Sequence, residues 1–391
     1  EHSKENTTTP LTFCEKEEFI YKGSPFKIQM RHNYEMKPLF VERMKELLGK
    51  ENFGRYKKSV ETPELRSIRV NTLKISVADL KKRLENKNWI IKQPFKENPE
   101  IFVIEGKYAN EKNSDDNLTS LETGGRGDDR GTREIIDLQP GELGRALEHL
   151  LGYYYAQEIA SMLPALVLNP KPNEIVLDLC ASPGSKTTQM ASMMKNTGTI
   201  IANEVKLDRI KILASNLERC GVMNTIITRK DGVALCERLK RSNKKEGVSV
   251  RENLAPLMFD KILVDAPCSG EGTIRSSPKT LLMWNINTIK TLSKLQKKLL
   301  ESAIEILKPK GEIVYSTCTH APEENEGVLN YVLNKFDNLK IEKINLPVKC
   351  TPGVLGWAGG NYNKEVEKSC RIYPHVSNTE GFFIAKIRRM K

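Results

Sequence analysis

The chain has 391 residues, of which 39% are hydrophobic and 29% charged, and its net charge is +12. This composition is typical of a globular protein with a sizeable core, and no apolar run reaches the roughly 20 residues of a membrane-spanning helix. The positive charge favours nucleic acid or another polyanion as a partner, although solubility alone would also account for it. The polar N-terminus lacks the apolar core of a secretory signal, so we expect a cytoplasmic protein, or a nuclear one if the source is eukaryotic.

Hydrophobic periodicity in the first 110 residues predicts a small α+β domain after a disordered tail at 1–20. The predicted elements are a helix at 33–48, a strand at 65–76, a helix at 77–89 and a strand at 100–106. Residues 1–110 hold 22 Lys and Arg against 16 Asp and Glu, which is half of the positive excess of the chain. The polar, Gly- and Asp-rich residues 111–134 predict a loop inserted into this domain, which we delimit at residues 21–150.

A predicted helix at 153–168 leads into a second domain, residues 151–391, in which strands and helices alternate. The predicted strands are 174–179, 198–204, 224–231, 260–267, 311–317 and 381–389, with helices at 186–195, 206–221 and 288–308. This alternation predicts a parallel, doubly wound sheet, so the fold class is α/β: a Rossmann-like domain with a smaller N-terminal α+β domain. The basic residues 236–256 could contact nucleic acid, but such a run is more often a solvated loop.

The eight cysteines occupy positions 14, 180, 220, 236, 268, 318, 350 and 370. None forms a Cys-x-x-Cys pair, which argues against a zinc site, and an intracellular chain keeps most thiols reduced. We therefore expect no metal, and we expect most of these side chains to be small buried hydrophobes.

The stretch "EIVLDLCASPGSKTTQM" predicts a strand, a tight loop and a helix. It matches neither the G-x-G-x-x-G fingerprint nor a P-loop, so a nucleotide phosphate is not its natural ligand. Glu204 ends the second predicted strand, where a carboxylate can bind both ribose hydroxyls of an adenosine, with Arg209 one helical turn beyond; Asp231 ends the third, within reach of an adenine edge. Each acid alone could be a helix cap or a surface charge, but three successive strand ends with this chemistry suit S-adenosylmethionine.

Cys268 in "DAPCSGEGT" and Cys318 in "YSTCTHAPEENEGV" each follow a predicted strand. With a methyl donor at hand, a thiol has a specific use, because carbon-5 of cytosine is a poor nucleophile. Adding a thiolate to carbon-6 converts the ring into an enamine whose carbon-5 can attack a methyl group. A base must then remove the carbon-5 proton so that the thiol is eliminated. Either cysteine alone would more often be a buried structural thiol.

Together, "DLCASPGSKTTQ", "DAPCSGEGT" and "YSTCTHAPEENEGV" closely resemble the RNA cytosine-carbon-5 methyltransferases of the Nop/Sun family, over residues 156–388. "RSIRVNTLK" and "LGYYYAQEIASML" extend the resemblance into the family's N-terminal RNA-binding module. The resemblance implies that Cys318 is the nucleophile and that Cys268 assists release of the methylated RNA. It also implies that Asp265 contacts the base edge and that Lys186 orients this acid and the cofactor loop.

The cofactor that the resemblance implies is S-adenosylmethionine. The positions that match its binding residues in the family are Cys180, Ala181, Ser182, Pro183, Gly184, Ser185, Lys186, Glu204, Arg209, Asp231 and Asp265.

Several residues depart from the family's usual pattern, since Ser182 and Ser185 replace Ala and Gly, Glu271 replaces Asp, and Ser276 replaces Lys. A serine at 185 resembles the tRNA-directed branch, so we predict tRNA as the substrate, with rRNA as the alternative. A DNA cytosine methyltransferase would use the Pro-Cys cysteine as nucleophile and would not need Thr-Cys. A non-catalytic RNA-binding protein with a relic fold would have lost some of these residues. We expect RNA as the partner, a monomer and no contact with a membrane.

Side chains alternate along a strand, so Arg66 and Arg69 in "LRSIRVNTLK" point to opposite faces. We expect one of them to meet RNA phosphate and the other to pack against the catalytic domain.

Overall fold

The computed structural model describes residues 35–109, 134–242 and 257–390. The predictions for residues 1–20 and 111–133, and for most of the basic run at 236–256, lie outside the described residues. In the described part of the chain, no helix is long and apolar enough to cross a membrane.

The catalytic domain is built on a mixed sheet with the strand order β12-β15-β16-β10-β9-β6-β7-β8 and with β11 paired to β16. Its parallel strands are β6 (Ile175–Asp178), β7 (Thr199–Asn203), β8 (Thr225–Thr228), β9 (Phe259–Asp265) and β10 (Leu307–Thr317). The antiparallel strands are β11 (Leu339–Glu342), β12 (Thr351–Pro352), β15 (Cys370–Ile372) and β16 (Phe382–Arg389). The predicted α/β fold class is therefore confirmed, but the sheet is mixed and not parallel throughout, because the predicted strand at 381–389 is antiparallel to β10. The chain runs outward from β6 to β8 and then returns to β9 on the other side of β6, so the strand order reverses between β6 and β9. Ligands of open α/β sheets bind at such a point, beyond the carboxyl ends of the strands.

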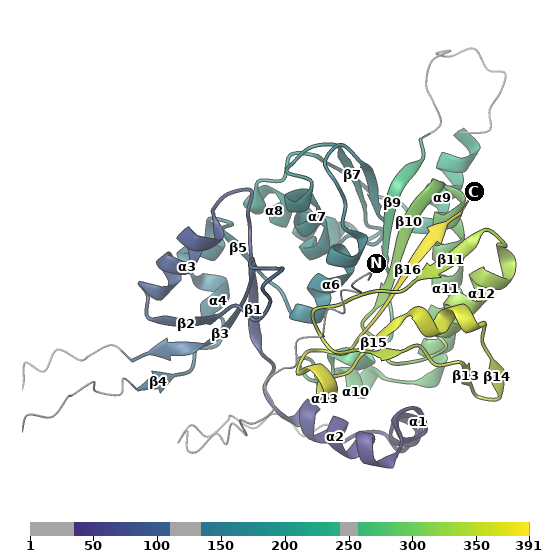
Figure 1. The fold of residues 1–391 in the computed structure, drawn as a ribbon, viewed down its shortest axis with the longest axis horizontal. Helices are drawn as coiled ribbons and strands as arrows, with labels where there is room; N and C mark the ends of the chain where they lie inside the picture. The colour runs from purple at the N-terminus through teal and green to yellow at the C-terminus, as the bar shows by residue number, and fades with distance from the viewer. Residues whose placement is uncertain (1–34, 110–133, 243–256, 391) are drawn as a thin grey trace, which may run out of the picture.

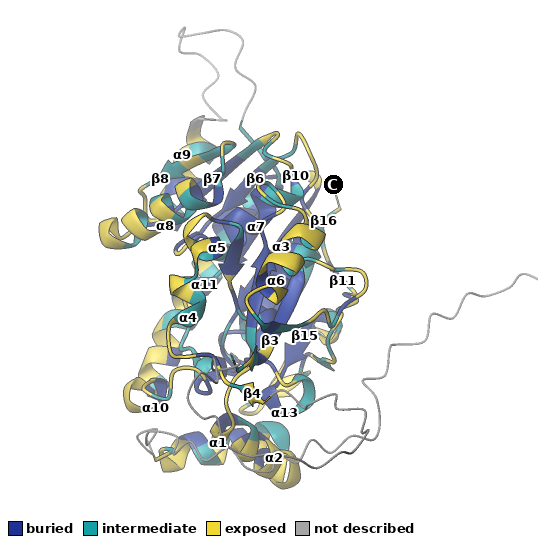
Figure 2. Cartoon of the chain, turned by 90° about the vertical axis from the view of Figure 1, so that its left-hand side faces the viewer, coloured by how far each residue is buried: buried dark blue, intermediate teal, exposed yellow. Residues whose placement is uncertain are grey.

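Helices cover both faces of this sheet (Figures 1 and 2). They are α6 (Ile159–Leu168), α7 (Ser185–Met193), α8 (Leu207–Cys220), α9 (Gly232–Ser242), α11 (Ile286–Glu305) and α12 (Glu326–Lys335). Adjacent residues of one strand point to opposite faces, and both faces are apolar: Val176 packs with α6 and α7, whereas Leu177 packs with α9, α11 and α12. This two-sided burial explains why the strands read as continuous hydrophobic runs in the sequence.

The N-terminal module is a separate antiparallel sheet of order β2-β3-β1-β5, with β4 paired to β3. Its elements are β1 (Arg66–Val70), α3 (Val77–Glu85), β2 (Trp89–Lys92), β3 (Ile101–Tyr108), β4 (Ile135–Ile136), α4 (Glu142–Arg145), α5 (Leu147–Leu150) and β5 (Tyr154–Ala156). The predicted helix at 153–168 was wrong in its first part, because Tyr154–Ala156 pair with β1 and the helix begins at Ile159. Tyr154 is fully buried in the core of the module, so tertiary pairing decides the structure of this aromatic segment.

Arg69 of β1 joins the module to the catalytic domain. It is 3% exposed and donates to the Ser185 carbonyl oxygen at 2.8 Å and to Thr188 Oγ1 at 2.9 Å, both on α7. Arg66 lies on the opposite face and pairs with Asp137. The expectation that the two arginines diverge, with one packed on the catalytic domain, is confirmed.

Two helices from the predicted N-terminal domain pack on the catalytic domain instead. These are α1 (Pro38–Leu48) and α2 (Lys50–Glu61), which lie beside the short helices α10 (Thr280–Met283) and α13 (Pro374–Ser377) (Figure 1). Phe40 and Tyr56 share a hydrophobic cluster with Ile274 and Trp284. Hydrophobic periodicity does not predict which domain these helices pack on, because an amphipathic helix shows which of its faces is buried but not which surface covers that face.

Candidate active site

The two motif cysteines meet at the carboxyl edge of the sheet. Strands β9 and β10 are adjacent and parallel, with Asp265 in register with Ser316, so the loops that leave them start side by side. Cys268 and Cys318 lie on these loops with their Sγ atoms 3.3 Å apart, and both are free thiols. The structure therefore brings the two cysteines together without joining them.

Cys268 is held in the thiol form. Its hydrogen bond with Cys318 and its burial raise the pKa of the Cys268 thiol well above the ordinary value, and the carboxyl of Glu324 acts in the same direction. A thiol in this state can donate a proton to a neighbouring sulfur but is a poor nucleophile.

Asp265 is fixed by two donors at the same edge. Lys186 Nζ lies 2.7 Å from Asp265 Oδ2, and the Ser316 hydroxyl donates to Asp265 Oδ1 at 2.7 Å. Lys186 also donates to Ser161 Oγ at 3.1 Å and lies 5.3 Å from the centre of the Phe382 ring. The lysine side chain is 9% exposed but the aspartate is 26% exposed, so the carboxylate is oriented while one side of it stays accessible to a ligand.

A buried pair that the sequence did not indicate clamps the Cys268 loop. Gln296 of α11 donates to the Pro267 carbonyl at 2.8 Å and to Glu324 Oε2 at 2.7 Å, and the same oxygen accepts the Ser269 amide at 3.0 Å. Both backbone neighbours of Cys268 are thus fixed through one carboxyl group. Burial raises the pKa of Glu324 to about 7. Glu324 and Ser316 lie in the Thr-Cys motif and Ser161 lies in "LGYYYAQEIASML", so these three could have been suspected, whereas nothing in the sequence points to Gln296.

The loop at the end of β6 has the shape that the sequence predicted for a cofactor site. Gly184 precedes α7 with φ of 101°, and a Cβ atom there would lie 2.9 Å from Leu213 Cδ1 on α8; only glycine fits both constraints. Ser182 and Arg209 tie the loop to α8, because Arg209 Nη2 donates to the Ser182 carbonyl at 2.6 Å and the Ser182 hydroxyl donates to the Arg209 carbonyl at 2.9 Å. The remaining loop residues lie on this backbone between β6 and α7: Cys180, Ala181, Pro183 and Ser185.

Glu204 lies at the end of β7 with a fixed carboxylate. It is 5% exposed, its Oε1 accepts the amides of Val205 and Lys206 at 2.9 and 3.0 Å, and its Oε2 lies 3.4 Å from Arg209 Nη1. Asp231 differs, since it is exposed and accepts the Ala234 amide at 3.1 Å as the cap of α9. Asp231 thus caps α9, which is one of the two roles considered for it from the sequence, and it remains at the same edge of the sheet.

The fit of this site to S-adenosylmethionine has support from a third acid, Asp178 at the end of β6. Its Oδ2 accepts the Thr187 hydroxyl at 2.7 Å, whereas its buried Oδ1 has no hydrogen-bond partner in the described structure. Burial raises the pKa of Asp178 to about 7. A buried acceptor without a donor is uncommon, and an ammonium group such as that of the cofactor's methionine moiety would satisfy it. Among the described residues, no three His, Cys, Asp or Glu side chains converge as a metal site.

Comparison with known sequences agrees with the geometry. The family model described as 16S rRNA methyltransferase RsmB/F matches residues 165–388. A tRNA (cytosine(49)-C(5))-methyltransferase of Pyrococcus abyssi is 40% identical over 349 residues, which are 89% of this chain and 95% of that protein. The ribosomal RNA small subunit methyltransferase F of Erwinia tasmaniensis is 35% identical over 357 residues, which are 90% of this chain but only 63% of that protein.

Two solved structures share the fold. A methyltransferase homolog protein from Pyrococcus horikoshii has a TM-score of 0.68 and 35% identity, with 90% of this chain and 94% of that chain covered. NSun6 from the same organism, solved with the S-adenosylmethionine analogue SFG, has a TM-score of 0.69 and 28% identity, with 91% and 98% covered.

The sheet and the loop at its switch point define an S-adenosylmethionine-dependent methyltransferase. The chain belongs to the RsmB/F (Nop/Sun) family and is an RNA cytosine-C5 methyltransferase. The family, the enzyme class, the cofactor and RNA as the substrate, all predicted from the sequence, are confirmed. The roles of the individual site residues stay predictions.

Proposed function

We propose that the chain methylates carbon-5 of a cytosine in tRNA, with Cys318 as the nucleophile and Cys268 as the group that assists release. The observation that carries this proposal is the 3.3 Å separation of the two Sγ atoms at adjacent strand ends, because a proton can pass directly between sulfurs at this distance. The preference for tRNA rests on the Pyrococcus abyssi relative, which matches this chain over nearly the full length of both proteins.

In the proposed mechanism, Cys318 attacks carbon-6 as a thiolate, and the electrons of the carbon-5–carbon-6 bond become available at carbon-5. Asp265 accepts a hydrogen bond from the amino group of the cytosine and fixes the ring, while Lys186, at 2.7 Å, holds the carboxylate in place. The bound cofactor supplies the methyl group. The target base must leave its stack to reach the thiol.

Release of the product requires two proton movements. A base removes the proton from carbon-5, and the electrons of that bond restore the double bond and expel Cys318. The Cys268 thiol donates its proton to the departing sulfur, which lies 3.3 Å away, and regains a proton from solvent. The network of Gln296 and Glu324 keeps the Cys268 loop in the required position.

The division of labour is tested with Cys318→Ala and Cys268→Ala on denaturing gels with RNA and S-adenosylmethionine. We expect no adduct and no 5-methylcytosine from Cys318→Ala, and an accumulated protein–RNA adduct from Cys268→Ala. Cys236→Ala, at a buried thiol of α9, is the matched control and should behave as wild type. An adduct from Cys318→Ala and none from Cys268→Ala would reverse the assignment.

Ribosomal RNA is the second candidate substrate, since the matching family model and the Erwinia relative both refer to small-subunit rRNA. Bisulfite sequencing of total RNA with and without the enzyme separates the two candidates. New protected cytosines confined to rRNA would overturn the tRNA assignment and leave the chemistry intact.

A further inference from the structure

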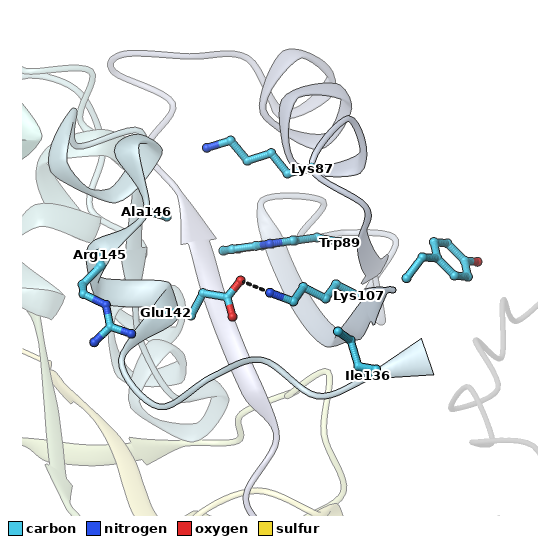
Figure 3. Close-up of a pocket in the computed structure, with 8 residues that line it drawn as sticks. Lys87, Trp89, Lys107, Ile136, Glu142, Arg145 and Ala146 are labelled. Carbon is cyan, nitrogen blue, oxygen red and sulfur yellow. Dashed lines mark hydrogen bonds and ion pairs between the residues drawn. The ribbon is translucent and has the colours of Figure 1, made fainter. Parts of the chain in front are cut away.

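The N-terminal module contains a cavity that shares no residue with the proposed active site. It has a volume of about 340 Å³ and lies between the β2–β3 hairpin, β4 and α4 (Figure 3). The lining residues are Lys87, Trp89, Lys107, Tyr108, Ile136, Glu142, Arg145 and Ala146. Its size is within the range of small-ligand sites and is sufficient for one nucleotide.

The register of the hairpin builds one wall. Trp89 and Lys107 are directly paired across β2 and β3, so their side chains share a face, whereas the side chain of Tyr108, the next residue, goes to the other face. Figure 3 shows the indole of Trp89 with Lys87 on one side and Lys107 on the other. Trp89 is 4% exposed, so it is a rigid back wall that presents only its rim to a ligand.

The charge of the cavity is positive. Three cations line it against one carboxylate, that of Glu142, which pairs with Lys107 at 2.8 Å. Lys87 pairs with Glu148, but that carboxylate is 1% exposed and is shared with Arg83. Glu148 therefore partly balances the Lys87 ammonium group, whose side chain is 41% exposed and accessible at the mouth.

Among the described lining residues, Arg145 is the cation that no carboxylate contacts directly, although its charge acts on Glu142. Its guanidinium donates to the Pro140 carbonyl at 2.9 Å, and no carboxylate lies within ion-pair distance of it in the described part of the chain. In Figure 3 the Arg145 side chain extends beside α4, and Glu142 lies between it and Lys107 of the hairpin.

We propose that this cavity binds one nucleotide of the RNA substrate at a point separate from the cytosine that is methylated. Arg145 contacts the phosphate, the base packs against the rim of Trp89, and Glu142 accepts a hydrogen bond from an exocyclic amino group. Phosphate contacts fix the position of an RNA, and base contacts select it. A second contact on the module, apart from the catalytic edge, lets the enzyme select RNAs in which two separate nucleotides reach both sites. The proposal rests on RNA as the substrate but not on the roles of the two cysteines.

The test compares Arg145→Ala with Lys96→Ala. Lys96 is exposed in the β2–β3 loop, at the end of the hairpin away from the Trp89–Lys107 pair, so its removal changes the net charge equally without touching the cavity. RNA affinity is measured at several salt concentrations in a Cys318→Ala background, and methylation is measured with each single variant. We expect Arg145→Ala to weaken binding about 5- to 20-fold, to reduce the slope of log affinity against log salt by about one, and to raise KM. Lys96→Ala should leave the affinity and KM nearly unchanged, and Arg145→Lys should restore part of the loss.

Equal effects of Arg145→Ala and Lys96→Ala would overturn the proposal, because general charge would then explain binding. Titration of the protein with adenosine, guanosine, cytidine and uridine monophosphates distinguishes an RNA nucleotide from a free one. Tight, Arg145-dependent binding of a mononucleotide that leaves RNA affinity unchanged would also overturn it. Binding of the cofactor product by calorimetry shows that each variant is folded. If methylation fails in every protein while RNA binding follows the expected pattern, the proposed chemistry is at fault and the nucleotide site stands.

Discussion

A buried ion pair behind the loop that carries Cys318 offers the sharpest test of how the fold supports the site. Arg371 of β15 and Glu326, the first residue of α12, have side chains that are 2% and 0% exposed. Arg371 Nε and Nη2 donate to the two carboxylate oxygens of Glu326 at 2.6 and 2.5 Å. Nη1 donates to the His320 carbonyl at 2.9 Å, two residues after Cys318. The arginine therefore fixes the chain as it leaves Cys318.

Arg371→Met is expected to destabilise the protein by about 3–5 kcal/mol, because it leaves the Glu326 carboxylate buried without its counter-charge. The double variant Arg371→Met/Glu326→Leu removes both charges and should recover most of this loss. The nearby pair of Arg43 and Glu323 is the control: its side chains are 14% and 25% exposed, so Arg43→Met should cost about 1 kcal/mol.

Urea unfolding measures these differences through the midpoint at constant slope. A loss below about 1 kcal/mol for Arg371→Met, or a double variant as unstable as the single one, would contradict the view that burial of the pair decides its effect. Methylation assays add a functional readout, since loss of the donor to His320 should lower kcat more than it changes KM.

Three further predictions concern the buried acids. Glu204→Ala should weaken binding of the cofactor product by about 1.5–3 kcal/mol through loss of a charge-assisted contact with the ribose; unchanged affinity in calorimetry would show that Glu204 does not contact it. Glu324→Gln removes a carboxyl that contributes to the raised pKa of Cys268. Alkylation of Cys268, measured by peptide mass spectrometry, should therefore begin at a lower pH than in wild type. An unshifted pH profile would contradict this. Burial raises the pKa of Glu158 to about 7 and of Glu380 to about 8, whereas unfolded glutamates titrate near 4.3. The folded state then binds more protons between these values, so the free energy of unfolding should fall as pH rises from about 4.5 to 8; Glu380→Gln should flatten this fall in thermal melts, and an equally steep dependence would count against the assignment.

Much of the catalytic domain could be predicted because its signals are local. Each parallel strand is a short apolar run followed by a loop, and alternation with helices leaves few topologies. The meeting of Cys268 and Cys318 follows from this pattern, since motifs at the carboxyl ends of adjacent parallel strands must lie at one edge. The structure adds the register of Asp265 with Ser316, which no spacing in the sequence specifies.

The errors occurred where a distant partner decides the structure. Tyr154–Ala156 have the length and composition of either a helix start or a strand, and only pairing with β1, more than 80 residues earlier, selects the strand. The predicted helix at 33–48 and the residues of α2 fell within the predicted N-terminal domain at 21–150, but Phe40 and Tyr56 pack against Ile274 and Trp284. Amphipathic periodicity identifies a buried face and is silent about what covers it.

The residues that distinguish the proposed role of Cys268 from that of Cys318 also lie far from Cys268 in the sequence. Both cysteines follow a strand end, so local position alone does not separate a nucleophile from a group that assists release. Cys268 differs from Cys318 in its buried neighbours. Glu324, which is 55 residues after Ser269 in the sequence, accepts the Ser269 amide, and Gln296 of α11 donates to Glu324. The hydrogen bond with Cys318, burial and, after them, this carboxyl group oppose ionisation of Cys268, so the thiol stays protonated 3.3 Å from the other sulfur. Position at a strand end therefore does not distinguish the two thiols. We infer that buried neighbours from the "PEENE" run and from α11 give them different tendencies to ionise.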